Sequence, residues 1–208
     1  MQPATRRPRK TTRRTRLELH VAGVAQAPIT PLDVLAEGRR RFLRGSRLDM
    51  RELAADLKIS RATLYRWVGD RERLMGEILW SLAERGLADA REYAGAAKGT
   101  EWVVRFYSRF MEIVAGFEPI RHFVEAEPDA ALRVLTSRHG VQQQRLIKTL
   151  RAVLEERAAA GELALRLPAE DLAFVMVRIG ESFIWREFIT GEEPDISHAT
   201  AVVRVLLS

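Results

Sequence analysis

The sequence predicts an all-α protein in which a small three-helix domain containing a helix-turn-helix precedes a larger helical domain. From Pro31 onward, apolar residues recur at the spacing of amphipathic helices. Glycine and proline residues separate these stretches, and no segment shows the period-two alternation of a half-buried strand. We therefore expect a disordered basic arm over residues 1–30, a helix-turn-helix domain over 31–80 and a larger helical domain over 81–208.

The helices of the first domain are predicted from their N-terminal ends. The first begins after Pro31. Asp49 is a suitable N-cap for the second, which is only about two turns long. Glu52 follows three residues later, which is the spacing of a capping box. Ser60 caps the third helix and Asp70 a longer fourth one.

Longer helices follow, with glycine and proline residues at most of their ends. They are expected over residues 71–93, 101–115, 119–126, 129–136, 140–160, 168–189 and 196–207. Before Pro31 the prediction is different, because residues 1–16 contain no large apolar side chain after Met1 and are expected to be disordered. Residues 17–27 are more apolar and could form a short helix or strand.

The composition restricts the class of protein. The chain has 208 residues, and its 47% hydrophobic content is enough for a substantial core. It contains no cysteine, which excludes disulfides, thiolate metal sites and cysteine nucleophiles. No apolar run approaches the roughly 18 residues of a membrane span, and the N-terminus lacks the apolar stretch of a secretory signal. We expect a cytoplasmic, nucleoid-associated protein without a membrane partner.

Charge is distributed unevenly along the chain. The net charge is +6 over residues 1–30, +3 over residues 31–80 and −3 over residues 81–208. A basic front half indicates that one end of the protein meets a polyanion. The basic arm could lie in a DNA minor groove or along phosphates, or it could be a tail with generic affinity for polyanions.

Two short helices joined by the tight turn LKIS have the layout of a helix-turn-helix. The second helix, in the segment SRATLYRWVGDRERL, would enter the major groove of double-stranded DNA. Arg61, Thr63 and Arg66 suit base edges, because arginine fits the acceptors of guanine and threonine offers a methyl group or a hydroxyl. Tyr65 and Trp67 can donate to phosphates while their rings pack.

Residues 31–80 resemble the DNA-binding domain of the TetR/AcrR family of bacterial transcriptional regulators. The resemblance rests on Leu53-Ala54, on the run ISRATLYRW and on the run DRERL. It implies that Ser60 caps the recognition helix and that Arg71 contacts the DNA backbone. The predicted DNA-binding residues are Lys58, Ser60, Arg61, Thr63, Tyr65, Arg66, Trp67 and Arg71. The alternative is a helical hairpin whose arginines only solvate a surface.

The sequence departs from the family pattern at three positions. Lys58 occupies the turn position that usually holds glycine, and a left-handed lysine there would cost on the order of 1 kcal/mol, although it could also reach a phosphate. Val68 replaces the usual phenylalanine. Asp49 stands where threonine or serine is favoured, so it should cap its helix but repel a phosphate.

The second domain carries aromatic stripes with polar groups placed among them. Such stripes most often form core, but helices with both kinds of residue can also wall an apolar pocket. In TetR-like proteins a pocket in this domain binds an inducer, and its helices shift the spacing of the two DNA-reading heads. The predicted ligand-binding residues are Trp102, Phe106, Phe110, His122, Phe123, Arg178, Glu181 and Trp185.

The last two expected helices resemble the pair that forms a four-helix dimer interface in the family. The predicted interface residues are Val175, Ile179, Phe183, Val202 and Leu206, and Val203 and Leu207 add apolar surface. A two-fold homodimer would present two recognition helices, so its operator should be nearly palindromic. The alternative is that this apolar surface packs inside one protomer.

The sequence gives little support for an enzyme, a metal site or a cofactor. The four histidines are scattered without ligand spacing, and no phosphate-binding, dinucleotide-binding or nucleophile motif is present. The run ESFIWRE over residues 181–187 resembles lactone-responsive family members linked to quorum-signal degradation.

These observations and the resemblance together imply a homodimeric transcriptional repressor that a small apolar effector releases from its operator. Two alternatives remain open: a DNA-binding structural protein that needs no effector, and a helical adaptor that binds other proteins.

Overall fold

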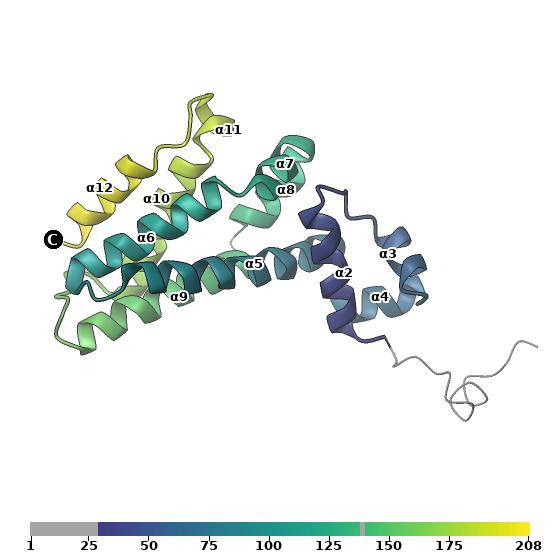
Figure 1. The fold of residues 1–208 in the computed structure, drawn as a ribbon, viewed down its shortest axis with the longest axis horizontal. Coiled ribbons are helices and arrows are strands. Elements are labelled where there is room, and N and C mark those ends of the chain that lie inside the picture. Colours follow the sequence, from purple (N-terminus) through teal and green to yellow (C-terminus); the bar gives the residue numbers. More distant parts are fainter. Residues whose placement is uncertain (1–28, 138–139) are drawn as a thin grey trace, which may run out of the picture. The chain divides into compact units, whose positions relative to one another are not determined.

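The computed structural model describes residues 29–137 and 140–208 (Figure 1). Within it, Pro31–Ser208 form one compact unit. The basic arm up to residue 28 and the short element expected over 17–27 lie outside the described residues.

All regular secondary structure in the described ranges is helical, which confirms the predicted all-α fold. The helices are α2 (Pro31–Leu43), α3 (Met50–Asp56), α4 (Arg61–Val68), α5 (Arg71–Ala94), α6 (Gly99–Ala115), α7 (Glu118–Ala126), α8 (Pro128–Thr136), α9 (Val141–Ala159), α10 (Ala169–Ile184), α11 (Arg186–Thr190) and α12 (Ile196–Leu206). With one exception, their boundaries agree closely with those expected from the sequence.

The exception is the helix expected over 168–189, which the structure divides into α10 and α11. The chain leaves the helical conformation at Trp185, whose φ and ψ are −91° and 14°. The Trp185 side chain is 5% exposed and lines a cavity between the long helices. The periodicity of the sequence could not reveal this break, because no glycine or proline marks it.

Helices α2, α3 and α4 pack on one another around a small core, and the first turns of α5 close that core. We call α2–α4 the head. Its buried apolar residues include Val34, Phe42, Leu53 and Leu64, and the Leu64 side chain is fully buried. The turn of the helix-turn-helix is thus held from both sides, because each short helix inserts a leucine into the same core.

We call helices α6–α12 the body, and three of them, α6, α8 and α9, pack on α5. Figure 1 shows α6 beside α5, and α5 also contacts α2, α8 and α9. Helix α10 packs on α9 and α12, and α12 also packs on α6. Residue 80, the predicted boundary between the two domains, lies inside α5, so a single continuous helix belongs to both parts.

Candidate nucleic-acid interface and apolar cavity

The recognition helix α4 begins at a well-formed N-cap, as predicted. The Ser60 hydroxyl accepts a hydrogen bond from the backbone N–H of Thr63 at 3.0 Å, and the two side-chain hydroxyls lie 2.9 Å apart. Ser60 therefore satisfies one of the free N–H groups of the helix start. The Thr63 hydroxyl is engaged locally, so its methyl group is the part that remains for a base contact.

The side chains of α4 divide into an exposed face and a packed face. Arg61, Tyr65 and Arg66 are exposed, whereas Trp67 is half-buried and packs against the core. The exposed face is the one that α4 can offer to a DNA groove. The structure thus brings together two arginines and a tyrosine on one side of a short, capped helix.

Lys58 lies in the turn with a φ of +54°, which makes it the one non-glycine residue with positive φ among those described. The turn is closed by hydrogen bonds from the Lys58 N–H to the Ala55 oxygen and from the Ile59 N–H to the Ala54 oxygen, both 3.0 Å long. A left-handed lysine costs on the order of 1 kcal/mol relative to glycine. The Lys58 side chain is exposed at the start of α4.

Asp49 caps α3, also as predicted. Its carboxylate accepts hydrogen bonds from the backbone N–H groups of Arg51 at 2.6 Å and Glu52 at 3.1 Å. These bonds, that of Glu52 first, lower the pKa of the Asp49 carboxyl. The Glu52 carboxylate lies 3.8 Å from Arg41, on the neighbouring helix α2.

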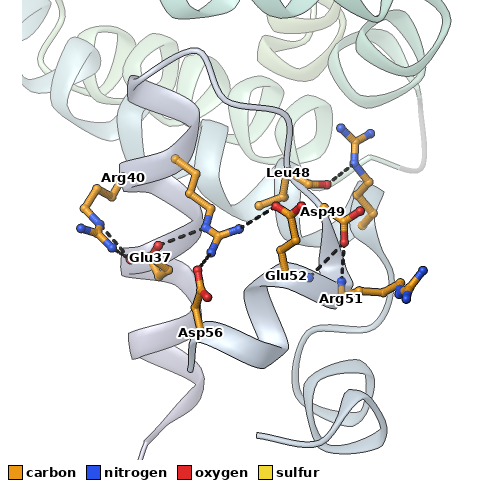
Figure 2. A network of polar contacts seen from close by, with 9 residues as sticks. Glu37, Arg40, Leu48, Asp49, Arg51, Glu52 and Asp56 are labelled. Atoms are coloured by element: carbon orange, nitrogen blue, oxygen red, sulfur yellow. Dashed lines mark hydrogen bonds and ion pairs between the residues drawn. The ribbon is translucent and has the colours of Figure 1, made fainter. Parts of the chain in front are cut away.

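A polar cluster fastens α2 to α3 (Figure 2). The Arg41 guanidinium lies between three carboxylates and donates to Glu37, at 3.0 Å, and to Asp56. Glu37 also accepts from Arg40 at 2.8 Å. These arginines are thereby engaged within the head, and the exposed cations of α4 are distinct from them.

Arg71, which the family resemblance places on the DNA backbone, is bound inside the protein in this structure. Its Nε donates to the Leu48 carbonyl oxygen at 2.8 Å, and its Nη2 donates to Glu127 at 2.6 Å. Arg47 lies 3.6 Å from the other oxygen of Glu127. Glu127 connects α7 to α8, so this carboxylate links two arginines near the head to the body.

A cavity of about 440 Å³ lies between the helices of the body. Side chains from α5, α6, α9 and α10 form most of its wall, and they are largely apolar. Of the predicted ligand-binding residues, Phe106, Phe110, Glu181 and Trp185 line this cavity. A cavity of this size falls in the range of small-molecule sites.

The other four predicted ligand-binding residues do not line this cavity. Trp102 is buried on another side of α6, where it stacks on Phe106 at 5.3 Å and receives the Arg157 guanidinium 4.6 Å from its ring. His122 and Phe123 line a smaller cavity of about 230 Å³, bordered by α7 and the connection between α2 and α3. Arg178 does not line the cavity, but it contacts Glu181 and Gln143, which do.

Those polar partners form a network at the wall of the large cavity. Arg178 lies 2.9 Å from Glu181 and donates to the side-chain oxygen of Gln143. Gln143 in turn donates to Glu181 and to the Leu135 carbonyl oxygen, the latter at 2.6 Å. Burial raises the pKa of the Glu181 carboxyl, and the charge of Arg178 opposes that rise only in part.

Sequence reasoning missed several lining residues, among them Leu43, Gln142 and Gly180. A Cβ atom at Gly180 would come within 2.8 Å of the Met111 sulfur and 3.0 Å of the Tyr107 hydroxyl, so a larger residue there would require these side chains to shift. Leu43 is the last residue of α2, and its place in the wall means that the cavity reaches the head. Nothing in a helical periodicity signals either role.

The predicted dimer residues lie on α10 and α12 with differing exposure. Val175 and Val202 are 36% and 37% exposed, and Ile179, Phe183 and Leu206 are half-buried. The Phe183 ring lies 5.1 Å from that of His198, which joins the two helices. Val203 and Leu207 are buried in the protomer's own core, so they add no outer surface.

Neither a metal site nor a membrane-spanning helix can be identified in the part of the chain that the structure describes. Its histidine, aspartate and glutamate residues form no group that could hold a metal ion. None of its helices is both long and apolar enough to cross a bilayer.

Comparison with known proteins gives one family and a consistent set of structures. Residues 98–208 match the family described as "Tetracyclin repressor-like, C-terminal domain". The transcriptional repressor QsdR of the TetR family from R. erythropolis has a TM-score of 0.79 and 26% identity, over 85% of this chain and 93% of that one. The TetR-family repressor AlkX from Dietzia sp. strain DQ12-45-1b, implicated in biodegradation of n-alkanes, has a TM-score of 0.59 and 25% identity, over 88% and 97%. No curated protein matches significantly.

Proposed function

Because the chain belongs to the TetR family of transcriptional regulators, we propose that it is a homodimeric repressor that a small apolar effector releases from a nearly palindromic operator. The observation that carries this proposal is the position of Leu43. This residue ends a helix of the head and also forms part of the wall of the large cavity. A molecule in the cavity would therefore contact the DNA-reading part of the protein directly.

DNA reading would depend on α4. Arg61 and Arg66 are exposed on a helix that is short enough to enter a major groove and is fixed by its cap and by Leu64. Thr63 would add its methyl group, and Lys58 and Tyr65 would reach phosphates beside them. The half-buried Trp67 would hold the helix in place and could offer only its indole N–H to the backbone.

A two-fold dimer would form through α10 and α12. The exposed parts of Val175 and Val202, with the half-buried Ile179, Phe183 and Leu206, supply an apolar surface on two neighbouring helices. Because residues 31–80 would then occur twice around a two-fold axis, the two half-sites of the operator would be inverted copies. The protein would act on DNA in the cytoplasm.

The path from the cavity to the DNA would run through α7. Phe117 and Ile120 line the large cavity at the start of α7, and Glu127 at its other end binds Arg71. An effector that displaced α7 would change how Glu127 holds this arginine, which the resemblance assigns to a phosphate. Coupling free energies of about 1–3 kcal/mol are typical of such linked sites.

The experiment that tests this proposal is selection of bound sequences from a random double-stranded DNA library with the full chain. We expect an enriched site with two inverted halves. Affinities for this site and for random DNA should then be compared at one fixed salt concentration, because phosphate contacts make both depend on salt. Equal affinity would contradict sequence-specific regulation and favour a DNA-binding structural protein, and no DNA binding would favour a protein adaptor.

The effector is tested separately by a thermal-shift screen with lipophilic and lactone-like compounds. We expect a subset of compounds to raise the melting temperature and to lower operator affinity, because a ligand that binds the folded state stabilises it. A screen without any hit would favour the alternative of DNA binding without an effector.

A further inference from the structure

The wall of the large cavity contains a hydrogen-bond acceptor that lacks a partner. The side-chain oxygen of Gln142, in the first turn of α9, is buried and receives no hydrogen bond within the described part of the chain. The nitrogen of the same amide is not among the buried unpaired atoms. Because buried polar groups in native proteins are nearly always paired, an acceptor without a donor indicates that something else can supply one.

Three other polar side chains of the wall, those of Tyr107, Gln143 and Glu181, are already engaged. The Tyr107 hydroxyl donates to the Met176 carbonyl oxygen at 3.0 Å, and Gln143 donates to the Leu135 oxygen at 2.6 Å. Glu181 is held by Gln143 and Arg178. The Tyr107 and Gln143 donors are therefore occupied, whereas the Gln142 oxygen has no partner.

The charge of the wall also restricts the ligand. The Glu181 carboxyl group lines the cavity, whereas its cationic partner Arg178 does not. An anionic group inserted here would meet a like charge in a poorly solvated place, which is costly. The charged side chains Arg85 and Asp89 at the cavity are exposed to solvent, and Asp89 is bound by Arg109.

We infer that the cavity takes a neutral, mostly apolar molecule that donates one hydrogen bond, from an N–H or O–H group, to the side-chain oxygen of Gln142. This inference rests on the proposed function, in which the same cavity is the effector site. A rotation of the flexible glutamine side chain would bring its oxygen toward the ligand. The apolar remainder of the molecule would contact residues such as Phe110, Leu146 and Leu43.

The test uses two probes that differ in a single donor, N-methyldecanamide and N,N-dimethyldecanamide, with the full chain and calorimetric titration. We expect the N-methyl amide to bind about tenfold more tightly, because a buried acceptor gains its missing partner. Decanoate, which carries a similar chain and an anionic head, should bind at least about tenfold more weakly than the N-methyl amide.

Variants then locate the donor contact. Gln142→Leu, similar in size to the wild-type side chain, should bring the affinity ratio of the two amides close to one. Gln144→Leu makes the same change on an exposed part of the same helix and should leave the ratio as in the wild type. Gln142→Met provides a second substitution if the leucine variant does not fold.

Several outcomes would overturn the inference. These are equal affinities of the two amides for the wild type, a ratio that survives in the Gln142 variants, decanoate binding as tight as that of the N-methyl amide, and no binding of either amide. None of these outcomes bears on DNA recognition, because the selection of bound DNA sequences needs no effector. Failure of the inference and failure of the proposed function are therefore distinguishable.

Discussion

The head and the body are held together in different ways. In the head, polar contacts add to the small apolar core of the short helices: Ser60 and Asp49 cap their helices, and Arg41 ties α2 to α3. In the body, long helices pack through apolar side chains and leave a cavity of about 440 Å³ among them. The head is thus suited to present a constant surface, and the body has an interior that a ligand can fill.

One carboxyl group in the head and one in the body have pKa values that are shifted in opposite directions. Asp49 accepts two backbone N–H groups at the protein surface, and these lower its pKa. Glu181 lies in the wall of the body, where burial raises its pKa. The Asp49 carboxylate stabilises the start of a helix, whereas the Glu181 carboxyl lies where a ligand and a proton can both act.

The largest effect should come from the head. Arg66→Ala is expected to lower operator affinity by roughly 10- to 100-fold, because a bidentate arginine–guanine contact is worth about 1–3 kcal/mol. Fluorescence anisotropy at fixed salt measures this. Arg166→Ala, an exposed arginine in the connection between α9 and α10, is the control and should bind normally. Full specific binding by Arg66→Ala would contradict the hypothesis that α4 is the recognition helix.

The dimer surface of the body should give the next largest effect. Val175→Glu is expected to weaken the dimer by about tenfold or more, because a two-fold axis would bury the new charge twice. Sedimentation at several concentrations measures the association. Leu132→Glu on α8 is a matched control, since Leu132 is 37% and Val175 36% exposed. If the two variants associate like the wild type, the interface lies elsewhere.

The head could be predicted almost completely from the sequence, because its determinants are local. The caps at Asp49 and Ser60 depend on residues within one turn, and the family pattern marks Lys58, whose φ is positive, as a position that usually holds glycine. The sequence did not reveal where Arg71 would lie, because its partner Glu127 is distant in the chain. The DNA contacts of all these residues stay predictions.

The helices of the body could be predicted from the sequence, but only four of the eight predicted ligand-binding residues line the cavity. Phe106 and Phe110 line the cavity, whereas Trp102 on the same helix does not and receives the Arg157 guanidinium over its ring. A helical stripe gives the buried face, but which buried side chains surround a void depends on how several helices meet. The break at Trp185 and the close approach at Gly180 arise from the same packing.

The contact between the head and the body can be tested by itself, through the ion pair of Arg71 and Glu127. Glu127→Gln should raise operator affinity by about fivefold, equivalent to ~1 kcal/mol for a partly exposed ion pair, because Arg71 becomes free to meet a phosphate. Glu72→Gln removes the same charge from the start of α5 and breaks a different link, the 2.9 Å ion pair with Arg133. Equal gains in both variants would mean that net charge, rather than the release of Arg71, controls affinity.

A smaller effect on stability is expected at the turn of the head. Lys58→Gly should raise the free energy of unfolding by up to about 1 kcal/mol, because glycine adopts a positive φ without strain. Urea denaturation measures the change. Lys148→Gly, at an exposed position inside α9, should instead be destabilising, because glycine is unfavourable in a helix interior. A Lys58→Gly protein no more stable than the wild type would show that the turn stores no strain.

The smallest effect, in the body, is a dependence of stability on pH. Because the pKa of Glu181 is raised above its ordinary value of 4.5, the folded protein binds this proton more readily than the unfolded chain. The resulting stabilisation is complete below pH 4.5 and is lost as pH rises through the folded pKa. The unfolding free energy of the wild type should therefore fall relative to Glu181→Gln over that interval, in denaturation at constant ionic strength. Glu118→Gln, at an exposed site, controls for the loss of a carboxyl group. If the unfolding free energy of the wild type instead rose with pH relative to that of Glu181→Gln, Arg178 rather than burial would govern the pKa of Glu181. The contrast with Asp49 would then disappear.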